Sequence, residues 1–138
     1  MSQSTDSLLL DGKPGELSRL AAGVSHFCAE HALGEQAEFD LNLVLEELFT
    51  NAVQHGGCEG MSAAVRIELK SLSEGVFIEI ADRGKPFDPT TTATPDLDTP
   101  LEMRQIGGLG IHLVRQIVRD LRYERVGGWN RLTMLRPT

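Results

Sequence analysis

Residues 41–56 read Leu-Asn-Leu-Val-Leu-Glu-Glu-Leu-Phe-Thr-Asn-Ala-Val-Gln-His-Gly, and they are the most informative stretch of the chain. Their apolar positions recur every three or four residues, which is typical of a helix with one buried stripe. The pattern predicts a helix from about residue 37 to residue 54. Gly56-Gly57 follows directly, as expected at the C-terminus of a helix.

Polar residues form a row along one shoulder of this predicted helix. Glu47, Asn51 and His55 are spaced i, i+4, i+8, so they share a face, whereas Glu46 lies on the other shoulder. An Asn oxygen is a hard ligand that suits Mg²⁺, and a carboxylate one turn away can accept the proton of an attacking hydroxyl. Taken alone, the row also fits a solvated stripe, and His55 alone fits a helix-end residue.

Periodicity on either side of this helix predicts the remaining elements. One helix is expected over about 16–31 and another from Gly110 to about Leu121, and alternating apolar and polar residues predict strands. The strand ranges are 7–10, 63–72, 76–81, 122–126 and 129–135. Short turns join neighbouring strands, so the sheet should be mixed and mostly antiparallel. The sequence therefore predicts an α+β two-layer sandwich with about three helices on one face of the sheet.

Two further motifs carry chemistry. Asp82 ends a predicted strand, so its carboxylate can leave the sheet and accept a hydrogen bond, for example from the exocyclic amine of adenine. Gly84 lets backbone approach such a base closely. Later, Gly107-Gly108-Leu109-Gly110 opens the third helix, where free N–H groups at the positive end of the helix dipole make an anion site. No Walker lysine follows this run, and a long loop rather than a strand precedes it.

Residues of about 83–106 lack periodicity and are rich in proline and threonine. A span of this length inside a compact domain is usually a functional lid or a disordered segment. The chain of 138 residues is of a length typical for one domain. We therefore expect residues 1–138 to form a single domain with a lid at about 83–106.

Composition excludes several classes of function. The net charge of −7 argues against nucleic-acid binding, which needs a basic surface. Residues 1–102 carry 18 acidic and 6 basic side chains, whereas residues 103–138 carry 2 and 7. The C-terminal part can face a polyanion or an acidic partner, but scattered solvated arginines fit these counts equally well. Cys28 and Cys58 fit neither a metal motif nor a disulfide framework. With no signal peptide and no apolar run of about 20 residues, a cytoplasmic location away from membranes is expected.

Three sequence blocks carry the candidate site residues: the polar row of the predicted helix at 37–54, the turn at 82–84 and the glycine-rich run at 107–110. In this order they resemble the GHKL superfamily of ATP-binding domains, whose fold is called the Bergerat fold. In that superfamily an N-box helix, a D-x-G turn, an ATP lid and a glycine-rich motif follow one another. Residues 82–89, Asp-Arg-Gly-Lys-Pro-Phe-Asp-Pro, and the run 106–114 are similar to those of bacterial anti-sigma-factor serine/threonine kinases. The resemblance covers about residues 16–137, nearly the whole chain.

The resemblance implies a role for each matching residue. Glu47 would be the general base, Asn51 the Mg²⁺ ligand, and Asp82 the reader of the adenine amine. The implied nucleotide-binding set is Asn51, His55, Asp82, Gly84, Gly107, Gly108, Leu109 and Gly110. Relatives often carry Gly-Thr where this chain has Gly128-Trp129-Asn130, so Asn130 is the candidate for the contact from that strand to the adenine-bound water. Gln54 stands where sensor histidine kinases often carry a lysine, which argues against that class.

The function implied is an ATP- and Mg²⁺-dependent serine/threonine protein kinase that also acts as an anti-sigma factor. Its substrate would be a STAS-type anti-anti-sigma protein in a partner-switching circuit, with a sigma factor as second partner and a homodimer as an expected assembly. Two alternatives stay open. One is a binding module that holds a nucleotide and sequesters a regulator without phosphoryl transfer, and the other is a simple ATPase.

Overall fold

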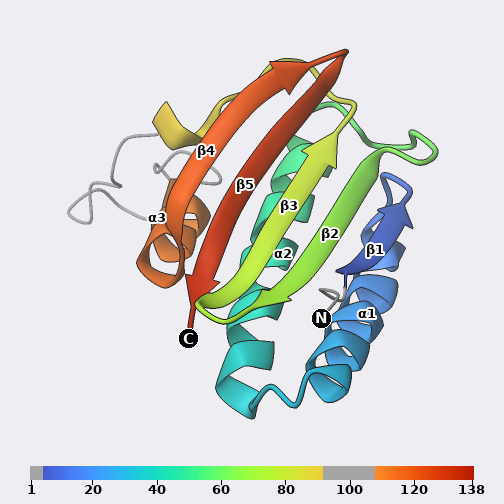
Figure 1. The fold of residues 1–138 in the computed structure, drawn as a ribbon. Helices are drawn as coiled ribbons and strands as arrows, with labels where there is room; N and C mark the ends of the chain where they lie inside the picture. The colour runs from blue at the N-terminus through green and yellow to red at the C-terminus, as the bar shows by residue number, and fades with distance from the viewer. Residues whose placement is uncertain (1–4, 92–107) are drawn as a thin grey trace.

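The computed structural model describes residues 5–91 and 108–138 (Figure 1). The α-helices are α1 Leu17–Glu30, α2 Glu35–Gln54 and α3 Gly108–Ile117, and short 3₁₀ helices are η1 Pro14–Glu16 and η2 Pro89–Thr91. The strands are β1 Thr5–Leu10, β2 Val65–Leu72, β3 Gly75–Asp82, β4 Arg119–Val126 and β5 Trp129–Pro137. The predicted α+β sandwich is confirmed. Residues 92–107, most of the predicted lid, lie outside the described residues.

The strands form one sheet in the order β1-β2-β3-β5-β4. All four strand pairings are antiparallel, so within the described part of the chain the sheet is not mixed as the sequence suggested. Strand β5 lies between β3 and β4. Because β5 runs antiparallel to β3, its first residues pair with the last residues of β3. Asp82 is directly opposite Asn130 in this register. This pairing matters for the site described below.

The core lies between the sheet and its helices. Figure 1 shows α1, α2 and α3 behind one face of the sheet, while the other face carries none of the described helices. Alternation in β2 buries Val65, Ile67 and Leu69 against the helices. The expected stripe of α2 is buried as well, and so are Phe49 and Val53. Among the described helices, none has both the length and the apolar character needed to cross a membrane.

The junction of α3 and β4 differs from the expected one. The helix ends at Ile117 instead of about Leu121, and the strand begins at Arg119 instead of Arg122. Asp120 adopts a left-handed conformation with φ of 58°, next to an irregularity in the β4–β5 register between Arg119 and Arg122. A bulge shifts the alternation of apolar and polar residues along a strand by one position. The apolar residues on its two sides then match a helical spacing, and the helix was predicted to continue too far.

Candidate nucleotide-binding site

The C-terminal half of α2 supplies the first part of the site. Asn51 is 8% exposed, and its side chain lines a cavity without making a hydrogen bond to the described residues. The helix ends one turn later, where the N–H groups of His55 and Gly56 both donate to the Asn51 carbonyl oxygen. His55 is not part of the cavity lining, and its Nε2 is buried without a hydrogen-bond partner.

The end of β3 supplies a carboxylate held in a fixed orientation. Asp82 Oδ1 accepts hydrogen bonds from the Gly84 N–H at 2.9 Å and from Asn130 Nδ2 at 3.0 Å, and Cys58 Sγ lies 3.8 Å away. No described residue donates a hydrogen bond to Oδ2. Asp82 also lines the cavity, so this second oxygen is available to a donor on a ligand.

Gly84 joins the strand end to the turn after α2. A Cβ at this position would lie 2.3 Å from the Gly56 carbonyl oxygen. That same oxygen accepts a hydrogen bond of 2.9 Å from the Lys85 N–H. Glycine is therefore needed here because two backbone segments meet, a reason that adds to the expected approach of backbone to a base.

Asn130 is the residue whose role sequence analysis underestimated. Its Nδ2 donates to Asp82 Oδ1 and, at 2.7 Å, to the Lys85 carbonyl oxygen. Its Oδ1 accepts hydrogen bonds from the Tyr123 hydroxyl at 2.6 Å, from Arg125 at 3.2 Å and from the Phe87 N–H at 3.3 Å. The amide thus fixes Asp82 and the first residues after β3.

Tyr123, Arg125 and Cys58 are functional neighbours that the sequence did not indicate. Arg125 also donates to the Gly84 carbonyl oxygen at 2.7 Å, which fixes the turn after Asp82 from the β4 side. Burial and the charge of Asp82 raise the pKa of the Cys58 thiol to about 11, so it stays protonated beside the carboxylate. The strand order β3-β5-β4 brings Tyr123 and Arg125 to the site, and no local motif encodes that order. Cys58 comes from the turn after α2.

The start of α3 brings the third block against the first. A Cβ at Gly110 would lie 2.0 Å from Glu47 Oε2, so the Glu47 carboxylate rests directly on the first turn of α3. The N-terminus of a helix favours negative charge, which suits a carboxylate or a phosphate at this place. Gly108 and Leu109 form the first residues of α3, whereas Gly107 lies outside the described residues.

A cavity lies where these parts meet. It is lined by Leu48, Asn51, Ala52, Gly56, Asp82, Phe87, Pro89, Asn130 and Leu132. Its volume of about 20 Å³ is enough for roughly one water molecule. Phe87, in the segment after β3, is 40% exposed and covers part of this cavity. Arg115 of α3 donates to the carbonyl oxygens of Pro89 and Thr90, which connects this segment to α3.

The fold is that of the GHKL class of histidine kinase-like ATPase domains. The family described as histidine kinase-like ATPase domain matches residues 10–136, and the chain belongs to this family. The resemblance seen in the sequence is thereby confirmed.

Two individual proteins and one crystal structure show which members of this family the chain is similar to. The serine/threonine-protein kinase BtrW of Bordetella bronchiseptica is 32% identical over 134 residues, which cover 97% of this chain and 94% of that protein. The serine-protein kinase RsbW of Listeria monocytogenes is 25% identical over 120 residues, covering 84% of this chain and 76% of the relative. A crystal structure of the RsbU and RsbW domains of a Mycobacterium tuberculosis protein has the same fold, with a TM-score of 0.67 and 16% identity. The match covers 97% of this chain but 32% of that longer one.

Proposed function

We propose that this chain is an ATP- and Mg²⁺-dependent serine/threonine protein kinase that acts on a STAS-type anti-anti-sigma protein and sequesters a sigma factor. In this proposal residues 1–138 form one ATPase domain, and residues of about 83–106 are its lid. The relatives named as serine kinases support the activity. The partners follow from the resemblance to anti-sigma-factor kinases stated above.

One observation carries the proposal: the three sequence blocks converge. Asn51 and Asp82 line a single cavity, and the Glu47 carboxylate, one turn from Asn51, touches Gly110 at the start of α3. The residues fit a magnesium nucleotide. Asp82 keeps one oxygen without a donor among the described residues, as a reader of an amine requires, and Asn51 keeps its amide oxygen available for a cation.

Each residue then has a defined task in phosphoryl transfer. Asp82 accepts a hydrogen bond from the adenine amine, and Asn51 holds Mg²⁺, which neutralises charge on the phosphates. The N–H groups at the start of α3 bind phosphate oxygens, and the residues proposed for this role are Gly107, Gly108, Leu109 and Gly110. Glu47 accepts the proton of the substrate serine hydroxyl as its oxygen bonds to the γ-phosphorus and ADP leaves.

His55 has a lesser place in this proposal. It follows Asn51 by one turn, but it is absent from the cavity lining. Its buried and unpartnered Nε2 would find a partner in the site only if the bound nucleotide or the lid supplied one. We therefore keep it as a nucleotide-binding residue of the proposal and assign it no step.

The test is incubation of the purified chain with γ-labelled ATP, Mg²⁺ and a panel of STAS-domain proteins. The kinase predicts label on one partner, a pure binding module predicts a complex without label, and a simple ATPase predicts free phosphate alone. Glu47→Gln should keep nucleotide binding and lose roughly 10²–10⁴-fold in transfer rate. Glu46→Gln is the matched control, since this adjacent carboxylate lies on the other shoulder of α2. Equal rates in the two variants would overturn the base assignment.

A further inference from the structure

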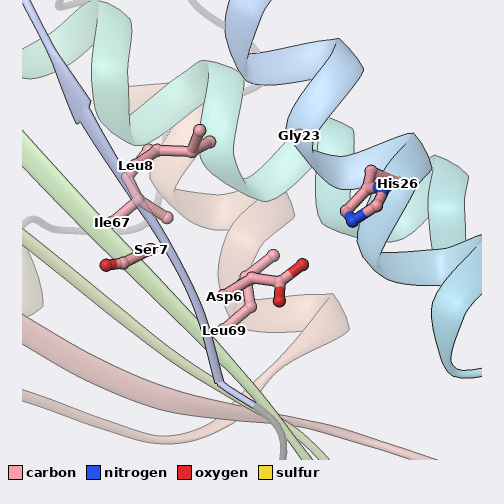
Figure 2. Close-up of a pocket in the computed structure, with 7 residues that line it drawn as sticks. All are labelled: Asp6, Ser7, Leu8, Gly23, His26, Ile67 and Leu69. Carbon is pink, nitrogen blue, oxygen red and sulfur yellow. The ribbon is translucent and has the colours of Figure 1, made fainter.

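A second cavity lies between β1 and α1, away from the nucleotide site. Its volume is about 270 Å³, and Figure 2 shows the residues that line it: Asp6, Ser7, Leu8, Gly23, His26, Ile67 and Leu69. The floor is apolar, while Asp6 from β1 and His26 from α1 stand on either side of the gap. Gly23 allows the close approach of the two elements, because a Cβ there would lie 2.6 Å from a Leu8 methyl group.

Asp6 occupies an unusual position for a carboxylate. Side chains alternate along a strand, so Asp6 is on the same face of β1 as Leu8 and Leu10, the face that packs on the helices. It is half-buried there, whereas Leu9 on the opposite face is 52% exposed. An acidic residue on a core-facing position needs a polar or charged partner to offset its lost hydration. No described lysine or arginine forms an ion pair with it.

The partners it meets are potential metal ligands on α1. One ligand atom each from Asp6, His26 and Glu30 lies within 4.8 Å of the other two. His26 and Glu30 are one helical turn apart, and His26 Nε2 is 3.2 Å from Glu30 Oε2. In a tetrahedral zinc site with bonds of about 2.0 Å, neighbouring ligand atoms are separated by roughly 3.3 Å. The His26–Glu30 pair already has this separation.

A further histidine, His31, lies beside the Glu30 carboxylate. His31 Nε2 lies 3.6 Å from Glu30 Oε1, the oxygen that does not face His26. This nitrogen is buried and has no hydrogen-bond partner, and the His31 ring packs against Phe27 with 4.5 Å between ring centroids. A fixed imidazole next to the outer oxygen of a ligating carboxylate is the kind of supporting contact that metal sites use.

We propose that Asp6, His26 and Glu30 bind a divalent transition-metal ion of the Zn²⁺ type. One imidazole and two carboxylates suit zinc, whereas Mg²⁺ and Ca²⁺ prefer oxygen ligands alone. Rotation of the half-exposed side chains brings Asp6 into the coordination sphere of the ion. The adjoining cavity leaves room for a water molecule as the fourth ligand. The ion cross-links the edge strand β1 to α1 and neutralises two carboxylates that face each other.

This site is independent of the proposed kinase activity, because none of its residues lines the nucleotide cavity. The experiment is calorimetric titration of the chelator-treated full chain with ZnCl₂ in the absence of nucleotide. We expect one equivalent of Zn²⁺ to bind, and MgCl₂ at the same concentration not to compete. His26→Ala should lose roughly 10²-fold or more in zinc affinity, beyond the loss typical of supporting residues. The His26 side chain is 73% exposed, so the variant should fold as the parent does.

The chain offers a matched control in His112. This histidine is also on a helix with a polar residue one turn on, since Gln116 Nε2 lies 3.2 Å from its Nε2. His112→Ala should keep the parental zinc affinity, and Zn²⁺ should raise the thermal midpoint of the parent and of His112→Ala but not of His26→Ala. Absence of stoichiometric zinc binding, or equal affinities in the two variants, would overturn the proposal whatever the outcome of the kinase assay.

Discussion

Asn130 donates a hydrogen bond of 3.0 Å to Asp82 Oδ1 across the β3–β5 pairing. The two residues are 48 positions apart in the chain, yet the amide sets the orientation of the carboxylate that we expect to read adenine. Asn130 is 4% exposed, and both ends of its amide are used. Asn130 is therefore a hydrogen-bonding hub that holds both Asp82 and the turn after β3 in place.

Removing this hub should weaken both stability and nucleotide binding. Asn130→Ala removes the part-buried hydrogen bonds to the Lys85 carbonyl oxygen and from the Tyr123 hydroxyl, and each such bond contributes about 0.5–1.5 kcal/mol. We expect a drop of that size or more in the free energy of unfolding, measured by urea denaturation, and weaker ATP binding in calorimetry.

A second asparagine provides the contrast. Asn42 is in the interior of α2, and its Oδ1 is buried without a partner. Asn42→Ala removes this unpaired oxygen and raises helix propensity by about 0.5 kcal/mol, so it should leave stability unchanged or increase it. If the two asparagine variants lose stability equally, the hydrogen-bond network around Asn130 does not have the role that we give it.

Two glycine variants should separate function from folding. A Cβ at Gly110 meets the end of the flexible Glu47 side chain, whereas a Cβ at Gly84 meets the Gly56 backbone. Gly110→Ala should fold like the parent and lose roughly 10²-fold in phosphoryl transfer, because the carboxylate is displaced. Gly84→Ala should lose roughly 2–4 kcal/mol of stability. Gly15→Ala is the control, since a Cβ there meets nothing within 4 Å.

Local pattern was enough to predict the helix row and the fold class. The apolar stripe of α2 orients the helix, and that orientation places Glu47 and Asn51 on the same shoulder whatever the rest of the chain does. Strand alternation likewise predicted which residues of β2 are buried. In β3 the expected apolar face is buried, but Glu79 and Ala81 on the opposite face are buried as well. These features depend on residues within one element, so the sequence contains them directly.

Features that depend on strand order were not predictable in the same way. Insertion of β5 between β3 and β4 creates the Asp82–Asn130 pair and brings Tyr123 and Arg125 to the site. The predicted end of α3 was wrong because of the bulge at Asp120 in β4. A residue other than glycine in the left-handed conformation has no strong signal in a single sequence. Register between distant strands is a property of the whole sheet.

An ion pair between α2 and β5 should stabilise the sandwich. Arg136 donates from Nε at 3.0 Å and from Nη2 at 2.8 Å to Asp40 Oδ2, and both side chains are largely buried. Asp40→Ala leaves this guanidinium without its partner, so unfolding in urea should cost about 2–4 kcal/mol less than in the parent.

The control is an exposed pair. Arg19 Nη1 lies 2.7 Å from Glu16 Oε2, but the Arg19 side chain is 56% exposed. Arg19→Met should change the free energy of unfolding by less than about 1 kcal/mol. An equal effect of the two substitutions would mean that burial does not strengthen the Asp40–Arg136 pair.

The Cys58 thiol should make stability depend on pH in the alkaline range. Burial and the negative charge of Asp82 raise its pKa from an ordinary value of about 9 to about 11 in the folded chain. Below about pH 9 both states keep the proton, and the contribution to stability is fully present. As pH rises further the unfolded chain loses the proton first, so the folded state loses about 2 kcal/mol of relative stability by about pH 11.

Comparison with Cys58→Ala isolates the pH-dependent contribution of the Cys58 thiol to the free energy of unfolding. The variant leaves a small cavity, which lowers its stability by an amount that does not depend on pH. The difference in unfolding free energy between parent and variant should therefore stay constant at pH 7–8 and then shift steadily in favour of the variant toward pH 10.5. Cys28, whose pKa burial also raises, is present in both proteins, so its titration cancels. Parallel stability curves over the whole range would show that Asp82 and the burial of Cys58 do not hold the thiol in its protonated form.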